Sequence, residues 1–253
     1  MTPASTIPTK STIVPFNFLE STYPVLRNFL EVMPLKELYY LRQKNENVNS
    51  LSRFRGEIVD VLCIITDTVE PWNCQYISHS EFMNRPTPTK PFAYLDVVMG
   101  SDISPKALLA KIGEQQYFGL YISGEYHWQD VVSFLHPGVS VLCLYEIMEL
   151  PKEDMKKFFK ILIDYKIERI QFCNNTCEES WFYAAHKTWN SLIGTGLKRV
   201  EVREWFNMEL TATTTDDATT KLSMNLLVDA DFDGEDEYFS GDELDDDEYD
   251  GHN

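Results

Sequence analysis

The chain has 253 residues, of which 43% are hydrophobic, so it can bury one substantial core or two small ones, and a disulfide-stapled miniprotein is excluded. Its formal net charge of -18 is concentrated near the end: 13 Asp or Glu and no Lys or Arg lie between Asp229 and Asp250, which leaves 27 acidic against 22 basic residues elsewhere. The rest of the chain lacks the clustered Lys and Arg that hold phosphates, so direct binding to nucleic acid or to an anionic membrane is not expected.

Residues 1–15 are rich in Thr, Pro and Ser, have no periodic apolar pattern, and are predicted to form a disordered leader. They lack the basic and apolar regions of a secretory signal, and no apolar run approaches the roughly 20 residues of a transmembrane helix. Without an export signal, an odd number of cysteines predicts reduced thiols: Cys63, Cys74, Cys143, Cys173 and Cys177. We therefore expect a cytoplasmic or nuclear protein.

Residues 16–55 are predicted to form a helical hairpin. Apolar side chains recur at spacings that place them on one stripe of an amphipathic helix, namely Val25, Leu26, Phe29, Leu30 and Met33. Pro34 marks a break, and a second short helix is predicted from Leu35, with Leu38 and Leu41 on its buried side.

Residues 56–210 are predicted to form a mostly parallel α/β domain. Residues 84–91 contain three prolines, which favours a loop over a helix or a central strand. Beyond this loop, strand-like segments at 118–122, 141–145, 169–173 and 199–203 alternate with helix-like stretches. Such alternation predicts parallel strands joined by right-handed crossovers.

The helix-like stretches have clear boundaries. Ser104-Pro105 and Leu150-Pro151 place proline in a first helical turn. A last helix, closed by Gly194 and Gly196, has its apolar residues near one face: Trp181, Ala184, Ala185, Trp189, Leu192 and Ile193. A period of 20 to 30 residues ending in a short strand is typical of an irregular leucine-rich-repeat array, in which Asn174 would take the asparagine position. An ordinary open parallel sheet accounts for the pattern equally well.

Residues 211–253 are predicted to form a disordered acidic tail. Asp229, Asp231, Asp233 and Gly234 match the start of a calcium-binding EF-hand loop, and residues 221–227 suit a helix before it. Position 12 of the loop is Ser240 instead of glutamate, so a self-repelling tail is the preferred interpretation. Such a run also suits an acidic-tailed interaction protein, or a chaperone for basic partners such as histones.

Motifs for common catalytic chemistry are absent from the sequence, which contains no phosphate-binding loop, dinucleotide fingerprint, nucleophile elbow or His-Glu-x-x-His zinc motif. The spacing of Cys173 and Cys177 suggests a metal, yet further ligands at close spacing are missing, and His186 has no ligand-type partner one helical turn away. We therefore expect no enzymatic activity, no cofactor and no metal site.

Residues Val25 to Leu41 resemble an F-box. The apolar helix is followed without a gap by Pro34-Leu35-Lys36-Glu37-Leu38-Tyr39-Tyr40-Leu41, as in the family pattern of a helix, a Pro-Lys-Asp-Leu-like turn and a second helix. The family's leading Leu-Pro is replaced by Ser21 and Thr22, and Asn47 and Asn49 replace the usual aromatic or basic residues. Residues 189–202 are similar to the tryptophan, glycine and strand pattern of F-box-associated domains in the large nematode-type family.

This resemblance implies a non-enzymatic substrate receptor of a cullin-RING ubiquitin ligase. The helical pair would dock on the ligase adaptor protein, and the carboxy-terminal sheet would bind a client. The implied adaptor-binding residues are Leu26, Leu30, Met33, Pro34, Leu38 and Leu41. The alternative is an ordinary hairpin packed on its own domain, and the two differ in whether apolar side chains stay exposed.

Overall fold

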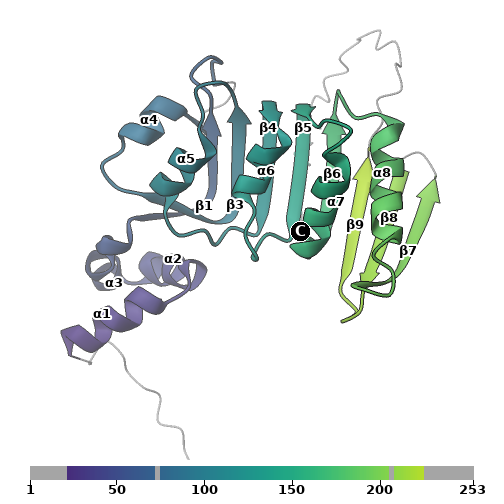
Figure 1. The fold of residues 1–253 in the computed structure, drawn as a ribbon. Coiled ribbons are helices and arrows are strands. Elements are labelled where there is room, and N and C mark those ends of the chain that lie inside the picture. Colours follow the sequence, from purple (N-terminus) through teal and green to yellow (C-terminus); the bar gives the residue numbers. More distant parts are fainter. Residues whose placement is uncertain (1–21, 72–74, 205–207, 225–253) are drawn as a thin grey trace, which may run out of the picture.

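The structure is a computed structural model that describes residues 22–71, 75–204 and 208–224 (Figure 1). Its elements are α1 (Tyr23–Val32), α2 (Leu35–Lys44), α3 (Glu46–Leu51), the 3₁₀ helix η2 (Arg53–Arg55), β1 (Glu57–Ile65), β2 (Tyr76–Ser78), α4 (His79–Asn84), β3 (Thr89–Met99), α5 (Pro105–Ile112), β4 (Gly119–His127), α6 (Trp128–Phe134), β5 (Val141–Glu149), α7 (Met155–Asp164), β6 (Arg169–Asn174), α8 (Glu179–Asn190), β7 (Leu197–Glu204), β8 (Met208–Thr214) and β9 (Thr219–Met224). Among these helices, none is long and apolar enough to cross a membrane.

Within the described ranges the strands form one nine-stranded sheet, in the order β2-β1-β3-β4-β5-β6-β9-β8-β7. Strands β1 to β6 are parallel and β9 joins β6 in parallel, whereas β7, β8 and β9 form an antiparallel meander. The predicted α/β class, with amino-terminal helices before a mostly parallel sheet, is confirmed.

Helices α4 to α8 lie over the same face of this sheet (Figure 1). Alternating strand residues such as Leu120 and Ile122 point towards these helices and are fully buried, whereas the intervening Tyr121 and Ser123 stay half-buried on the other side. We call that second side the open face. At the end of β6, the buried amide of Asn174 donates to the main-chain carbonyl of Tyr145 at 3.1 Å.

The predicted start of the acidic tail at residue 211 is wrong, because residues 208–214 and 219–224 form β8 and β9. The predicted helix over 221–227 is also wrong over the part that the structure describes, since Lys221 to Met224 lie in β9. Leu222 and Met224 are fully buried at a spacing of two, which only a strand beside β6 can satisfy. The leader at 1–15 and the EF-hand-like segment at 229–240 lie outside the described residues.

The proline-containing loop is shorter than the predicted 84–91, because α4 ends at Asn84 and β3 begins at Thr89. Pro91 lies inside β3, opposite Val59 of β1, but β3 pairs with β4 only from Tyr94 onwards. The missing N–H of this proline therefore costs no bond to β4. Similarly, α7 begins at Met155 and not at Pro151, which starts a turn closed by the Asp154 N–H.

Candidate functional site

The N-terminal helical unit, residues 22–55, has its own small core. Leu26, Leu30, Leu35 and Leu38 are buried there against the amino-terminal ends of β1 and β3. The helical unit is therefore packed on the sheet along one face of each helix, and it lies at the β1 side of the sheet (Figure 1).

Arg55 anchors this unit. Its guanidinium donates to the carbonyls of Leu30, Glu31 and Met33 at 2.5 to 3.0 Å, which satisfies carbonyls at the carboxyl end of α1. The same group forms a 2.9 Å ion pair with Glu114, which lies between α5 and β4. One buried side chain thus ties α1 to the loop that precedes the central strands.

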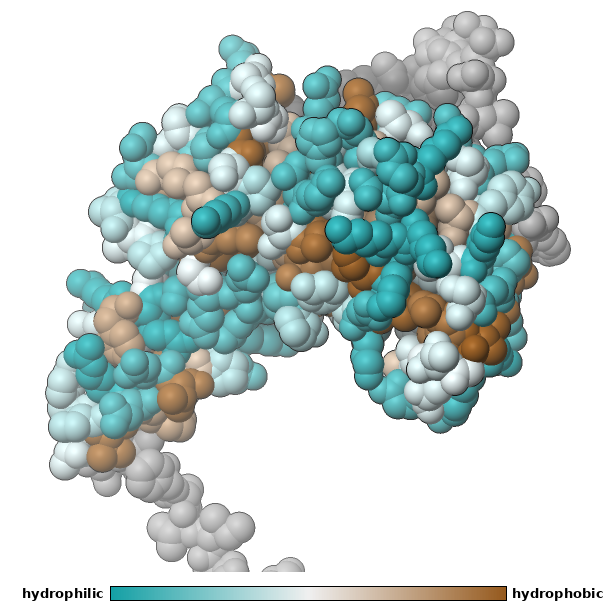
Figure 2. All heavy atoms as spheres, in the orientation of Figure 1, coloured by the Kyte–Doolittle hydropathy of each residue, from teal (hydrophilic) through white to brown (hydrophobic). Residues whose placement is uncertain are grey.

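The side of α1 next to these buried residues exposes an apolar outer stripe, formed by Val25, Phe29 and Val32, with exposed fractions of 54%, 44% and 78%. These residues follow the i, i+4, i+7 spacing of one helix face. Hydrophobic residues are visible on the surface of the N-terminal helical unit in Figure 2. A stripe of this kind is the feature that an adaptor-binding helix needs.

The structure buries some of the predicted adaptor-binding residues and leaves others partly or fully exposed. Leu26, Leu30 and Leu38 are buried against their own chain, so a partner cannot reach them in this conformation. Met33 and Leu41 are partly buried and Pro34 is exposed. The sequence placed Val25 and Phe29 on the same stripe as Leu26 and Leu30, and it contained no signal for which edge of that stripe would be covered.

The open face of the sheet has an aromatic half on β3, β4 and β5. Tyr94, Tyr121 and Tyr145 come from successive strands, and the rings of Tyr94 and Tyr121 meet edge to face with centroids 5.5 Å apart. Such half-buried tyrosines offer both apolar area and a hydroxyl to a protein partner.

A largely buried carboxylate, Asp96, lies beside these tyrosines on the open face. Burial raises the pKa of Asp96, and the hydroxyl of Tyr76 donates to its carboxylate at 2.8 Å. Burial, followed by the interaction with Asp96, raises the pKa of Cys63 to about 11. Cys63 therefore stays a thiol at neutral pH and is a poor nucleophile.

The two cysteines considered for a metal lie in different environments. Cys173 is on the open face, where its sulfur accepts from Gln171 at 3.3 Å. Cys177 packs against the main core, with its sulfur 3.8 Å from that of Met224, and burial raises its pKa to about 12. The electrostatic interaction with Cys173 adds to this rise in the pKa of Cys177, so the two thiols lie near each other.

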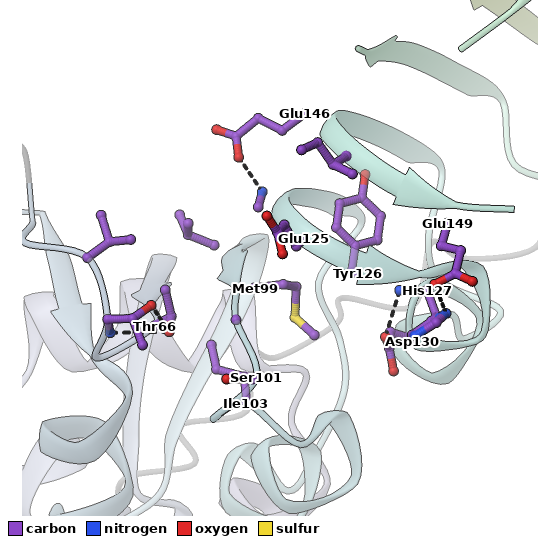
Figure 3. Close-up of a pocket in the computed structure, with 16 residues that line it drawn as sticks. Thr66, Met99, Ser101, Ile103, Glu125, Tyr126, His127, Asp130, Glu146 and Glu149 are labelled. Atoms are coloured by element: carbon purple, nitrogen blue, oxygen red, sulfur yellow. Dashed lines mark hydrogen bonds and ion pairs between the residues drawn. The ribbon is translucent and has the colours of Figure 1, made fainter. Parts of the chain in front are cut away.

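A cavity of about 780 Å³ lies at the carboxyl ends of β1, β3, β4 and β5 (Figure 3). In parallel α/β sheets this edge is the usual place for ligands. The residues of the described ranges that line it include four carboxylates and one histidine but no Lys or Arg: Glu125, Asp130, Glu146, Glu149 and His127. The arrangement favours a neutral or cationic group and disfavours a phosphate.

Several of these polar groups already have structural roles. The His127 ring lies 3.0 Å from Glu149, while its main-chain N–H donates to Asp130 and begins α6. Glu146 accepts from the Gly124 N–H at 2.6 Å (Figure 3). Asp67, His79 and Asp102 cluster beside this cavity, where Asp102 accepts from the Asp67 N–H and from the hydroxyl of Thr66.

The cavity wall contains a backbone irregularity that sequence patterns did not indicate. Gly124 and Glu146 both have positive φ, at 86° and 58°, and they lie where β4 and β5 interrupt their pairing. A Cβ atom on Gly124 would come within 2.2 Å of the Met99 carbonyl oxygen. Only glycine therefore fits this position without moving β3.

Replacing Gly124 with alanine is expected to lower the free energy of unfolding by more than the roughly 1–2 kcal/mol that a left-handed backbone costs, because the clash with β3 adds to it. Gly113→Ala is the matched control, since Gly113 also has positive φ but has open space around it. Urea denaturation followed by circular dichroism measures both. Equal losses would show that the close approach to Met99 is unimportant.

Comparisons of the chain with protein-family models, with curated proteins and with solved structures give no match.

Proposed function

We propose that the protein is a non-enzymatic protein-binding receptor whose N-terminal helical unit docks on a ubiquitin-ligase adaptor of the cullin-RING type. The observation that supports this proposal is the outer stripe, because Val25, Phe29 and Val32 remain exposed while Leu26 and Leu30 of the same helix are buried. A hairpin that served only its own fold would gain nothing from an apolar stripe facing solvent.

The second surface of the proposed receptor is the open face. The described helices α4 to α8 cover one side of the sheet, and none of them lies over the tyrosines of β3, β4 and β5 on its other side. The outer stripe belongs to α1, whereas these tyrosines belong to β3, β4 and β5, so adaptor and client would contact different elements. In this proposal the protein holds a client near the ligase and breaks no bond itself.

Val32→Asp tests the adaptor contact. Because Val32 is 78% exposed, the change leaves the core intact while placing a charge in the outer stripe. We expect capture of a purified ligase adaptor protein to weaken by at least about tenfold, as for an interface hot spot. The measurement is a titration of full-length protein with adaptor at micromolar concentration, with folding checked by circular dichroism.

Val202→Asp is the matched control, because Val202 is 38% exposed on β7, at the other end of the sheet. It is expected to bind the adaptor like the unmodified chain. If the unmodified chain forms no complex, or if Val32→Asp and Val202→Asp bind equally well, the ligase proposal fails.

A further inference from the structure

The open face has a second, basic half on β6, β9, β8 and β7. Register places four cationic side chains and two carboxylates on it: Arg169, Lys221, Arg199, Arg203, Glu201 and Glu209. Two ion pairs confirm that these side chains share one side, Lys221 with Glu209 at 2.8 Å and Arg199 with Glu201 at 3.0 Å. The surface is therefore net positive on a chain whose total charge is -18.

Two of these cations form no ion pair within the described part of the chain. Neither Arg169 nor Arg203 forms an ion pair with another residue that the structure describes. Arg169 and Lys221 border a groove of about 310 Å³ that extends to Tyr94 and Tyr121, and no Asp or Glu is among the described residues that line it. This groove is suited to a carboxylate-rich segment whose side chains are directed at Arg169 and Lys221.

The chain itself supplies such a segment. Strand β9 lies between β6 and β8 and ends at Met224, and residues 225–253 follow directly. Between Asp229 and Asp250 they contain 13 Asp or Glu and no Lys or Arg. Asp229 is five residues beyond Met224, so an extended chain between them reaches about 17 Å. Neighbouring strands are about 4.8 Å apart, so this reach spans several strands of the basic half.

We infer that residues 225–253 dock on the basic half of the open face of their own chain. Tethering at Met224 gives this segment an effective concentration in the millimolar range, so many individually weak ion pairs suffice. The contact is electrostatic and is expected to weaken as salt rises. This inference does not depend on the ligase proposal. The docked segment would, however, cover the surface next to Tyr94 and Tyr121 that a client would need.

Zero-length carbodiimide cross-linking of the full-length protein tests this inference, because it joins a lysine amine to a carboxylate in contact with it. Lys221 is the lysine of the basic half, while Lys156 and Lys187 are exposed on the helix-covered side. At about 20 mM salt, links from the segment 229–250 to Lys221 should exceed those to Lys156 or Lys187 several-fold, and they should fall at about 500 mM salt. The link between Lys221 and Glu209 serves as an internal standard.

Charge reversal sharpens the test. Arg169→Glu combined with Arg203→Glu should reduce the Lys221 links to the level of the other lysines, whereas Lys156→Glu combined with Lys187→Glu should leave them unchanged. Mixing ¹⁵N-labelled with unlabelled protein separates links within one chain from links between copies. Links spread evenly over all lysines, or formed only between copies, would overturn the inference and leave the acidic segment free for basic partners.

Discussion

Replacing Leu30 with alanine is expected to lower the free energy of unfolding of the N-terminal helical unit by about 2–5 kcal/mol, the usual cost of truncating a buried leucine. Leu30 is fully buried among the side chains that hold α1 to α2 and to the sheet. Val32→Ala, two residues away on the exposed side, should cost less than about 0.5 kcal/mol. Urea denaturation, with hydrogen exchange read over residues 23–51, measures both variants.

These two variants also show which residues are suitable for testing the adaptor contact. A charge at Leu30 or Leu38 would be buried without water, so adaptor binding would be lost through unfolding and would say nothing about the interface. If Leu30→Ala and Val32→Ala had equal effects on stability, the assignment of inner and outer faces of α1 would be incorrect.

Replacing Arg55 with methionine is expected to lower the free energy of unfolding by about 3–5 kcal/mol, the usual cost of removing one partner of a buried ion pair. Methionine keeps much of the volume but leaves the carbonyls of Leu30, Glu31 and Met33 without their donor. The loss of stability should lie near the lower end of this range, because Glu114 keeps its 3.3 Å contact with Lys90 and is partly exposed.

Arg53→Met is the control for this prediction, since Arg53 lies in the same short helix but is exposed. Hydrogen exchange should show faster opening of residues 23–51 in Arg55→Met, with the exchange of β5 and β6 unchanged. Similar exchange in both variants would mean that Arg55 is not the anchor of the helical unit.

Several elements were predictable because their pattern is local. The helices before and after Pro34 follow from apolar spacing and from the proline itself. Strands β4, β5 and β6 have alternating or continuous apolar residues between polar turns, and each prediction overlaps the observed strand. Asn174, which follows the predicted strand 169–173, donates to the main-chain carbonyl of Tyr145 on the neighbouring strand.

Other elements were missed because their stability comes from distant neighbours. The segment 211–224 is rich in threonine and charge, so it looked like the start of the acidic tail, yet Ala212 and Leu222 are fully buried in the main core. Gly124 gives no local sign that its hydrogen atom faces the carbonyl of Met99.

The sequence by itself determined the α/β class, the break at Pro34, the amphipathic character of α1 and the acidic charge after Asp229, because each depends on residues close together in the chain. The tertiary arrangement was needed to show which edge of α1 is covered, which strands lie beside β6, and where the cations of β6, β7 and β9 gather. Those outcomes depend on the burial of surfaces contributed by residues far apart in sequence, such as Arg55 with Glu114 and Arg169 with Lys221.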